Sequence, residues 1–261
     1  MLSAQEWSRF HGPNGSGLSK TKGIPVQWTS SDIAWEFDLP GQGHSSPVLW
    51  GTRLFNTCSD HDKAVQKFLC IDAISGKLLW QKEYQSKNYR IHKFNSYSSS
   101  TPVADANHVV FTWTTKDSDI LLCLDHNGNE KWQRDFGAFE TQHGNGNSPI
   151  ILRNLVIYPH DHFGKSCVYA IDLKTGKDVW VRDRNSAKPS HSTPCIYRSS
   201  NGKEQLIFTS DAHGIYALNP ENGAELWESG PKTFDKRCVL SPVLVKGKIL
   251  GTCGSGGGGN Y

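Results

Sequence analysis

The hydrophobic positions of the chain fall in short apolar runs that are separated by polar turns, and these runs recur in a fixed order. Each unit opens with Ser or Thr before Pro and an apolar strand, and a second apolar strand follows after a turn. A hairpin that ends on Trp closes the unit. In the copy from Ala170 to Trp180, Asp172 opens the turn and Gly176 occupies a position that favours positive φ. This order predicts four short antiparallel strands in each unit.

The units repeat with a period of roughly 45–55 residues, which is typical of the blades of a β-propeller. The hairpin recurs at residues 70–80, 123–132, 170–180 and 217–227. The opening Ser/Thr-Pro step recurs at Pro47, Pro102, Pro149, Pro194 and Pro242. The last unit therefore has an opening strand pair but no hairpin.

We expect a single all-β domain over residues 1–261, an incomplete β-propeller of four-stranded antiparallel blades. The predicted parts are four full blades at 46–85, 100–137, 147–184 and 192–229, and a truncated blade at 240–261. Residues 33–39 match the last strand of a blade, so they predict a closing strand supplied ahead of the first blade. That strand and the half blade together lack one strand, which indicates a fragment of a longer propeller. Residues 1–32 are predicted to form a loop segment held over the domain by Trp7 and Phe10.

The amino-acid composition agrees with an all-β protein and argues against some classes of function. Charged residues make up 20% of the chain, with 25 Gly, nine Trp and a single Met. A net charge of +3 is too small to indicate a nucleic-acid partner. There is no apolar run of about 18 residues that could span a membrane, and no signal peptide is visible at the start.

The seven cysteines cannot all pair internally, because their number is odd. Cys70 and Cys123 occupy the positions that Ala170 and Ala217 occupy in the other hairpins, so we expect them to be small buried packing residues. The chain has no C-x-x-C pair, so a zinc site of thiolates is not predicted.

The hairpin A-x-D-x-x-T-G-K-x-x-W, intact from Ala170 to Trp180, resembles the blade motif of the PQQ-like propellers. That family includes quinoprotein alcohol dehydrogenases and the BamB assembly factor, and the opening from Trp7 to Gly17 is similar to a bacterial subgroup of it. The resemblance implies a periplasmic or secreted protein. It also implies that a Trp of each blade docks on the neighbouring blade, and these residues are Trp80, Trp132, Trp180 and Trp227.

The resemblance leaves two functions open. The enzymes of the family carry a disulfide between adjacent cysteines, a Glu/Asn/Asp set around calcium, and a catalytic Asp. This sequence has no adjacent cysteines, and no position matches the calcium set. We therefore predict no cofactor, no metal and no catalytic residue, and a binding or scaffold propeller. The alternative is an oxidoreductase that depends on PQQ and calcium, with its catalytic residues mostly outside these 261 residues.

Two kinds of loop share one face of the predicted propeller: the connections between blades, and the turns between the second and third strands. These loops gather hydroxyl, amide, imidazole and carboxylate groups around the axis, where propellers commonly bind ligands. The candidate binding residues are His44, Ser45, Ser99, His143, Asn145, His191, Asp60, Asp161 and Asp211. We expect a protein, peptide or glycan partner, no nucleic acid, and a monomer when the propeller is complete.

Structural roles for these residues stay open. Ser or Thr before Pro can simply cap the inner strand, and a loop His is commonly solvated or bonded to backbone. The run His160-Asp161-His162 contains metal-ligand types, but adjacent strand residues point to opposite sides of a sheet, so no metal site is predicted there. No G-x-S-x-G nucleophile turn accompanies the Ser, His and Asp residues, which disfavours a hydrolase.

Overall fold

The computed structural model describes residues 6–186 and 188–254, and they form four four-stranded antiparallel sheets and one two-stranded sheet. The first sheet contains β1 (Val48–Trp50), β2 (Arg53–Asp60), β3 (Val65–Asp72) and β4 (Leu78–Gln85). The second contains β5 (Val103–Ala104), β6 (His108–Thr114), β7 (Asp119–Asp125) and β8 (Glu130–Asp135). The third contains β9 (Ile150–Leu152), β10 (Leu155–His160), β11 (Cys167–Asp172) and β12 (Asp178–Asp183).

The fourth sheet contains β13 (Cys195–Arg198), β14 (Glu204–Ser210), β15 (Gly214–Leu218) and β16 (Glu225–Glu228). The two-stranded sheet contains β17 (Val243–Val245) and β18 (Lys248–Leu250). Strands are adjacent in chain order in every sheet, so each sheet is a meander. The predicted all-β architecture of propeller blades is confirmed, and the four full sheets, called blades 1 to 4 below, lie inside the ranges predicted for them.

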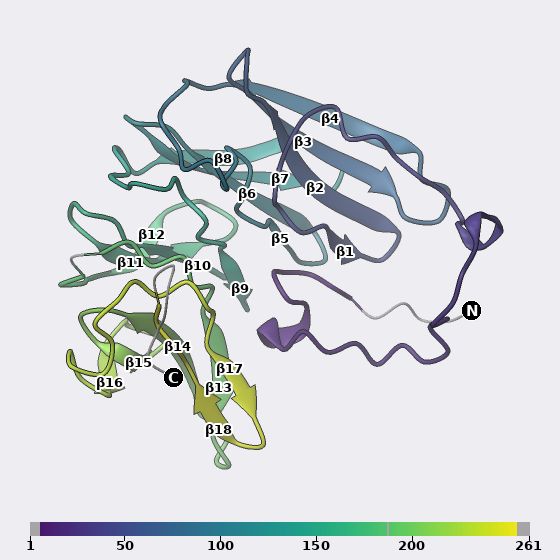
Figure 1. Cartoon of the computed structure of the whole chain (residues 1–261). Helices are drawn as coiled ribbons and strands as arrows, with labels where there is room; N and C mark the ends of the chain where they lie inside the picture. The colour runs from purple at the N-terminus through teal and green to yellow at the C-terminus, as the bar shows by residue number, and fades with distance from the viewer. Residues whose placement is uncertain (1–5, 187, 255–261) are drawn as a thin grey trace.

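The blades fan around their first strands, which lie innermost (Figure 1). The core lies between neighbouring blades and not inside any one of them. In β6, Val109 and Phe111 pack in the cluster shared with blade 1, whereas Val110 packs in the cluster shared with blade 3. Alternate strand residues point to opposite faces, so a strand sandwiched between two blades needs an uninterrupted apolar run.

Tryptophans join consecutive blades in one repeated geometry. The indole Nε1 of Trp80 donates to His126 O at 2.9 Å, that of Trp132 to Leu173 O at 2.8 Å, and that of Trp180 to Pro220 O at 2.8 Å. Each acceptor lies in the hairpin turn of the next blade. The indole also covers the turn glycine, as Trp180 covers Gly223, where an added Cβ would lie 2.5 Å from the ring.

Trp227 differs from the other three. Its Nε1 donates to Gln205 Oε1 of its own blade at 2.8 Å, and its side chain is 36% exposed. Among the described residues, the two-stranded sheet that follows blade 4 offers no hairpin turn to receive it. The docking role that the resemblance implies for Trp227 therefore has no counterpart in the described part of the chain.

Residues 33–39, where a closing strand is predicted, have no strand partner among the described residues. Trp35 nevertheless repeats the tryptophan geometry, because its Nε1 donates to Ala73 O at 3.0 Å and its ring covers Gly76. This side chain ties the segment to the hairpin turn of blade 1.

Residues 7–16, the N-terminal strap, run along the inner strands and connect distant blades (Figure 1). Trp7 pairs with Leu49 of blade 1 through two backbone hydrogen bonds of 3.0 and 2.9 Å. The Arg9 guanidinium donates to Pro194 O, and the Asn14 side chain bonds both the N–H and the carbonyl of Ile196 in blade 4 at 2.8 Å. The strap thus joins blade 1 to blade 4.

No helix within the described residues is long and apolar enough to cross a membrane.

Candidate functional site

The segments that precede the inner strands contact one another in sequence and form a continuous layer, called the connector arc below. It consists of residues 40–47, 86–102, 136–149, 184–186 with 188–194, and 229–242. The N–H groups of His44 and Ser45 both donate to Ser98 O at 3.0 Å. The Asn95 side-chain amide donates to His143 O, and His191 N donates to Cys238 O at 2.8 Å.

The hydroxyls that precede the prolines link neighbouring connectors. Thr101 Oγ1 accepts from Ser46 N at 3.1 Å, Ser148 Oγ accepts from Thr101 N at 3.0 Å, and Ser241 Oγ accepts from Thr193 N at 2.9 Å. Each bond runs from one blade to the next. These hydroxyls are therefore already used to hold the inner strands together, which favours the structural interpretation of the Ser/Thr-Pro steps.

Four consecutive connectors each contribute one basic side chain to a group whose members act on one another electrostatically. We call His92, His143, His191 and Arg237 the axial basic cluster. The rings of His92 and His143 lie 4.9 Å apart between centroids, and Gly146, close to His143 in the same connector, lies against the His191 ring. His143 and His191 were among the predicted binding residues. His92 and Arg237 were missed, although each occupies a connector as the two predicted histidines do.

The cluster is electrostatically unusual because, apart from partial burial, only basic groups shift the pKa values of His143 and His191. Burial lowers the pKa of His191 to about 4, and His143 and Arg237 act in the same direction. Burial also lowers the pKa of His143, with further contributions from Arg237 and His92. Both imidazoles are therefore neutral at pH 7, and each can donate one N–H hydrogen bond.

The predicted carboxylates lie apart from this cluster and have partners of their own. Asp60 Oδ1 accepts from Lys63 N at 3.1 Å, which lowers the pKa of Asp60. Asp211 accepts from Ser186 Oγ at 2.6 Å. Asp161 is buried 2.9 Å from Arg184, and burial raises its pKa to about 6 against the opposing effect of the arginine.

The remaining predicted residues divide between the surface and the interior. His44 is exposed, Ser45 Oγ donates to Ser46 O, and Ser99 Oγ donates to Asn95 Oδ1. Asn145 is buried, and its amide donates to Tyr158 Oη at 3.2 Å. These residues shape the connectors and do not join the axial basic cluster.

Asn145 belongs to a buried polar group around Asp119, which sequence reasoning did not select. The Tyr158 hydroxyl lies 2.9 and 2.8 Å from the two carboxylate oxygens of Asp119, and His160 Nε2 lies 3.1 Å from Oδ2. Burial raises the pKa of Asp119, and the nearby His160 ring opposes this shift. Asp119 is completely inaccessible to solvent, so the group stabilises the contact between blades 2 and 3 and offers no surface to a substrate.

The run His160-Asp161-His162 does not converge on one point. His160 faces Asp119 and Asp161 faces Arg184, whereas His162 Nδ1 accepts from Glu140 N at 3.1 Å. Each of the three side chains therefore has a partner of its own.

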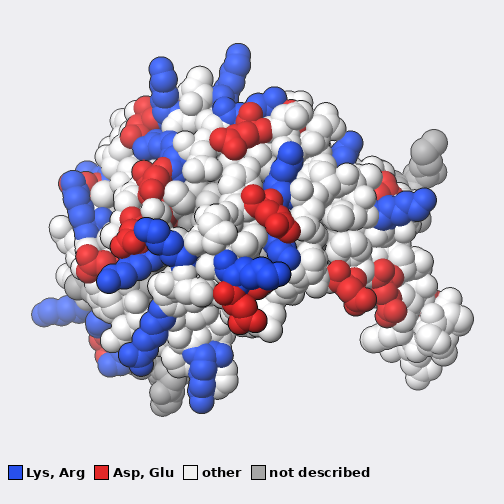
Figure 2. Space-filling model, turned by 90° about the horizontal axis from the view of Figure 1, so that it is seen from above, with Lys and Arg blue, Asp and Glu red and all other residues white. Residues whose placement is uncertain are grey.

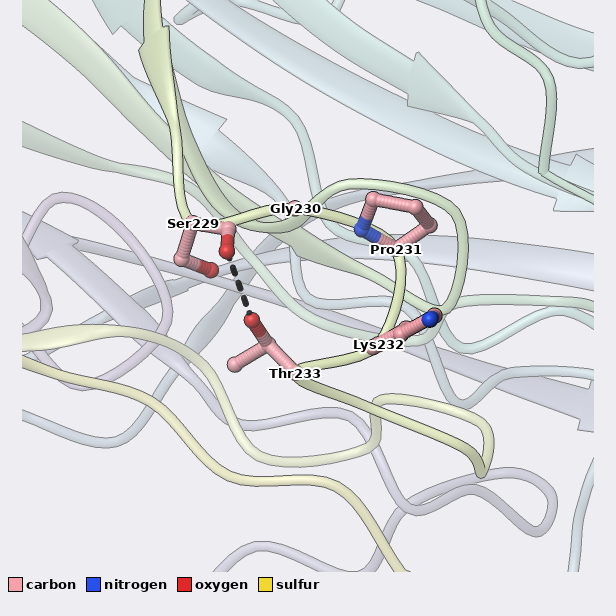
Figure 3. A pocket seen from close by; sticks show the side chains of 5 residues that line it. All are labelled: Ser229, Gly230, Pro231, Lys232 and Thr233. Atoms are coloured by element: carbon pink, nitrogen blue, oxygen red, sulfur yellow. Dashed lines mark hydrogen bonds between the residues drawn. The ribbon is translucent and has the colours of Figure 1, made fainter.

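Two further surface regions gather fewer groups that could bind a ligand. On the face shown in Figure 2, basic and acidic side chains are interspersed, so this face presents no large area of one sign. The hollow in Figure 3 is lined by Ser229, Gly230, Pro231, Lys232 and Thr233, where Thr233 Oγ1 donates to Ser229 O at 2.9 Å. Because one short loop forms the whole lining, no groups from other blades converge there.

The family follows from comparison with known proteins. A family model described as outer membrane protein assembly factor BamB matches residues 69–250, which is more than half of the chain. The chain belongs to this BamB family. Over 126 residues, the BamB-family chain is also 29% identical to quinoprotein alcohol dehydrogenase PedH of Pseudomonas putida, a match that covers 46% of the chain and 20% of PedH.

Solved structures agree on the fold of the BamB-family chain. Quinohemoprotein alcohol dehydrogenase from Comamonas testosteroni matches with a TM-score of 0.63 at 16% identity, over 95% of this chain and 45% of that structure. BamB from Moraxella catarrhalis matches with a TM-score of 0.51 at 18% identity, over 75% of this chain and 54% of that structure. The chain spans about half the length of these proteins. Identities this low establish the fold alone.

The quinoprotein resemblance implies calcium, and the axial residues can be tested against that ion. Calcium takes about six to eight oxygen ligands, commonly from carboxylates. Among residues 6–186 and 188–254, one group of three ligand side chains converges within 4.8 Å, formed by His213, Glu225 and Glu228. Glu225 and Glu228 lie on β16, the outer strand of blade 4. The described residues of the axial basic cluster in this BamB-family chain therefore do not fit a calcium site.

Proposed function

We propose that this BamB-family chain is a binding module whose connector arc takes an acidic group of a protein, peptide or glycan. The observation that carries the proposal is the axial basic cluster, in which Arg237 and three imidazoles come together from four connectors. Arginine pairs with carboxylates through two parallel N–H bonds, and imidazole N–H groups can complete such a site.

A second cation on the inner side of the propeller supports the same ligand class. Arg9 is 6% exposed and bonds Pro194 O, three residues after His191 in the same connector. No carboxylate among the described residues forms an ion pair with it, and burial lowers its pKa to about 10. A buried cation without a counter-charge raises the local positive potential, which favours an anion nearby.

The test is isothermal titration calorimetry with hexaglutamate, and with hexaglutamine as the uncharged counterpart. We expect hexaglutamate to bind the wild-type chain and hexaglutamine to bind at least tenfold more weakly. Arg237→Ala should weaken hexaglutamate binding about tenfold, because a charge-assisted hydrogen-bond pair is lost. Lys232→Ala is the matched control, since Lys232 is an exposed cation of the same connector that lies outside the cluster. Equal binding of both peptides, or an equal effect of both substitutions, would contradict the proposal.

The competing proposal is an oxidoreductase that uses PQQ and calcium. Its support is the similarity to quinoprotein alcohol dehydrogenase PedH, and it requires residues beyond these 261, because no two cysteines here are adjacent. Titration of a longer form of the protein, one that includes those residues, with PQQ and calcium distinguishes the two. A ligand that binds only the native state raises the melting temperature, so an unchanged Tm and an unchanged quinone absorbance would rule out this alternative.

A further inference from the structure

Cys238 and Cys253 lie together at one end of the connector arc. Cys238 follows Arg237 in the connector between β16 and β17, and Cys253 comes just after β18. Both side chains are buried, and they share one apolar cluster with Phe234, packed against Ile215. Among the described residues, no other pair of cysteines shares such a cluster: Cys70, Cys123 and Cys195 each belong to a different one.

A backbone hydrogen bond joins the two segments beside the cysteines. Gly254 N donates to Arg237 O at 3.2 Å. Arg237 and Gly254 are the direct neighbours of Cys238 and Cys253, so this bond holds the two cysteine-bearing segments together. A disulfide requires Cβ atoms about 3.5–4.5 Å apart, and the two thiols already share one small buried cluster. A small movement of either segment is therefore enough for a bond.

We propose that Cys238 and Cys253 form a disulfide, a redox modification that links the connector between β16 and β17 to the segment after β18. The two thiols lose two protons and two electrons to an external disulfide, such as glutathione disulfide. One cysteine first forms a mixed disulfide with glutathione and releases one reduced glutathione. The second cysteine then displaces the other glutathione and leaves the internal bond.

Burial sets the conditions under which the bond forms. It raises the pKa of the Cys238 thiol to about 12, so the reactive thiolate is scarce in the folded protein at neutral pH. The bond is expected to form as the chain folds in an oxidising medium, and to exchange slowly once it is buried. The weak contact of Cys253 Sγ with Asp235 Oδ1, at 3.8 Å, is given up when the bond forms.

The disulfide has a consequence for the connector arc that does not depend on the ligand. Cys238 O accepts from His191 N at 2.8 Å and from Ser190 Oγ at 3.3 Å, and Arg237 is the preceding residue. Fixing Cys238 therefore fixes the segment that carries Arg237 against the neighbouring connector. Closure of a ring of about 15 residues also restricts the unfolded chain and raises the melting temperature by several degrees.

The test is thiol counting by mass spectrometry after refolding in a glutathione redox buffer. The protein is unfolded in an alkylating reagent, and alkylated cysteines are counted with and without prior reduction. We expect the unreduced wild type to show two fewer alkylated sites than the seven cysteines of the sequence, and a cross-linked peptide that contains Cys238 and Cys253. Full alkylation, or a cross-link between other cysteines, would overturn the proposal.

Cysteine-to-serine variants distinguish this disulfide from oxidation at other cysteines. Cys238→Ser and Cys253→Ser should each leave all remaining cysteines open to alkylation and remove the redox dependence of the Tm. Cys167→Ser is the matched control, because the Cys167 thiol bonds Asp183 Oδ1 at 3.4 Å and a serine hydroxyl can keep that bond. It should retain the cross-link and the Tm difference. A control variant that also lost the cross-link would contradict the assignment to Cys238 and Cys253.

Discussion

The hairpin turns and the connectors both contact the next blade, but they use their residues in opposite ways. At the turns, the same contact is built three times, with Trp80, Trp132 and Trp180 each bonded to a backbone carbonyl of the following turn. The connectors do not share a repeated sequence, and four of the five each supply one basic residue to a single cluster. Residues that repeat from blade to blade therefore assemble the propeller, and residues that do not repeat are the ones available to bind a ligand.

The largest expected effect tests whether the tryptophan contacts stabilise the fold. Trp132 is 8% exposed between blades 2 and 3, whereas Trp227 is 36% exposed and bonds its own blade. Trp132→Ala should lower the free energy of unfolding by about 3–5 kcal/mol, as expected when a large buried aromatic is removed. Trp227→Ala should cost less than about 1 kcal/mol. Urea unfolding followed by circular dichroism measures both, and similar losses would mean that the docking geometry is not what stabilises the blades.

A smaller effect distinguishes turn glycines from connector glycines. Gly223 has φ of +67°, and a Cβ there would lie 2.5 Å from the Trp180 ring. Gly230, in a connector, has φ of +94°, but a Cβ there would meet no atom within 4 Å. Alanine at either position is strained by about 1 kcal/mol, and at Gly223 the displaced indole should add about 1–2 kcal/mol. Thermal unfolding should therefore show the larger loss of Tm for Gly223→Ala. An equal loss would show that the indole adjusts without cost.

The sequence predicted the repeated part of this molecule well and the connectors poorly, for a physical reason. A strand sandwiched between blades, such as β6, must be apolar on both faces, and a turn under an indole needs glycine. Both requirements leave a pattern that can be recognised in the local sequence. The axial basic cluster depends on how four segments of unrelated sequence meet, and neither His92 nor Arg237 has a neighbour in sequence that indicates it. Asp60, Asp161 and Asp211 were selected because they lie in loops of the same face, but local partners hold them away from the cluster.

The smallest expected effect is the pH dependence of binding at the axial basic cluster. In the unliganded protein the pKa of His191 is about 4, so this imidazole is neutral at pH 5.5. A bound carboxylate favours the protonated form and raises that pKa, so binding takes up a proton when the pH lies between the two values. Hexaglutamate affinity should rise about threefold to tenfold from pH 7.5 to 5.5, where its carboxylates stay ionised. Calorimetry in two buffers of different ionisation enthalpy measures the proton uptake directly.

The control for this prediction is His191→Gln, which keeps a hydrogen-bond donor at the arc but cannot be protonated. Its affinity should vary less with pH, and it should take up fewer protons on binding. The lowered pKa of His191 has the opposite effect on folding. Without ligand, the free energy of unfolding decreases as the pH falls from about 6.5 towards 4, because the imidazole of the unfolded chain is protonated first. His191→Gln should lose less stability over that range. If wild type and variant gained affinity equally on acidification, proton uptake would have to be assigned to another group, and His191 would be a structural residue of the connectors like Ser148 and Thr101.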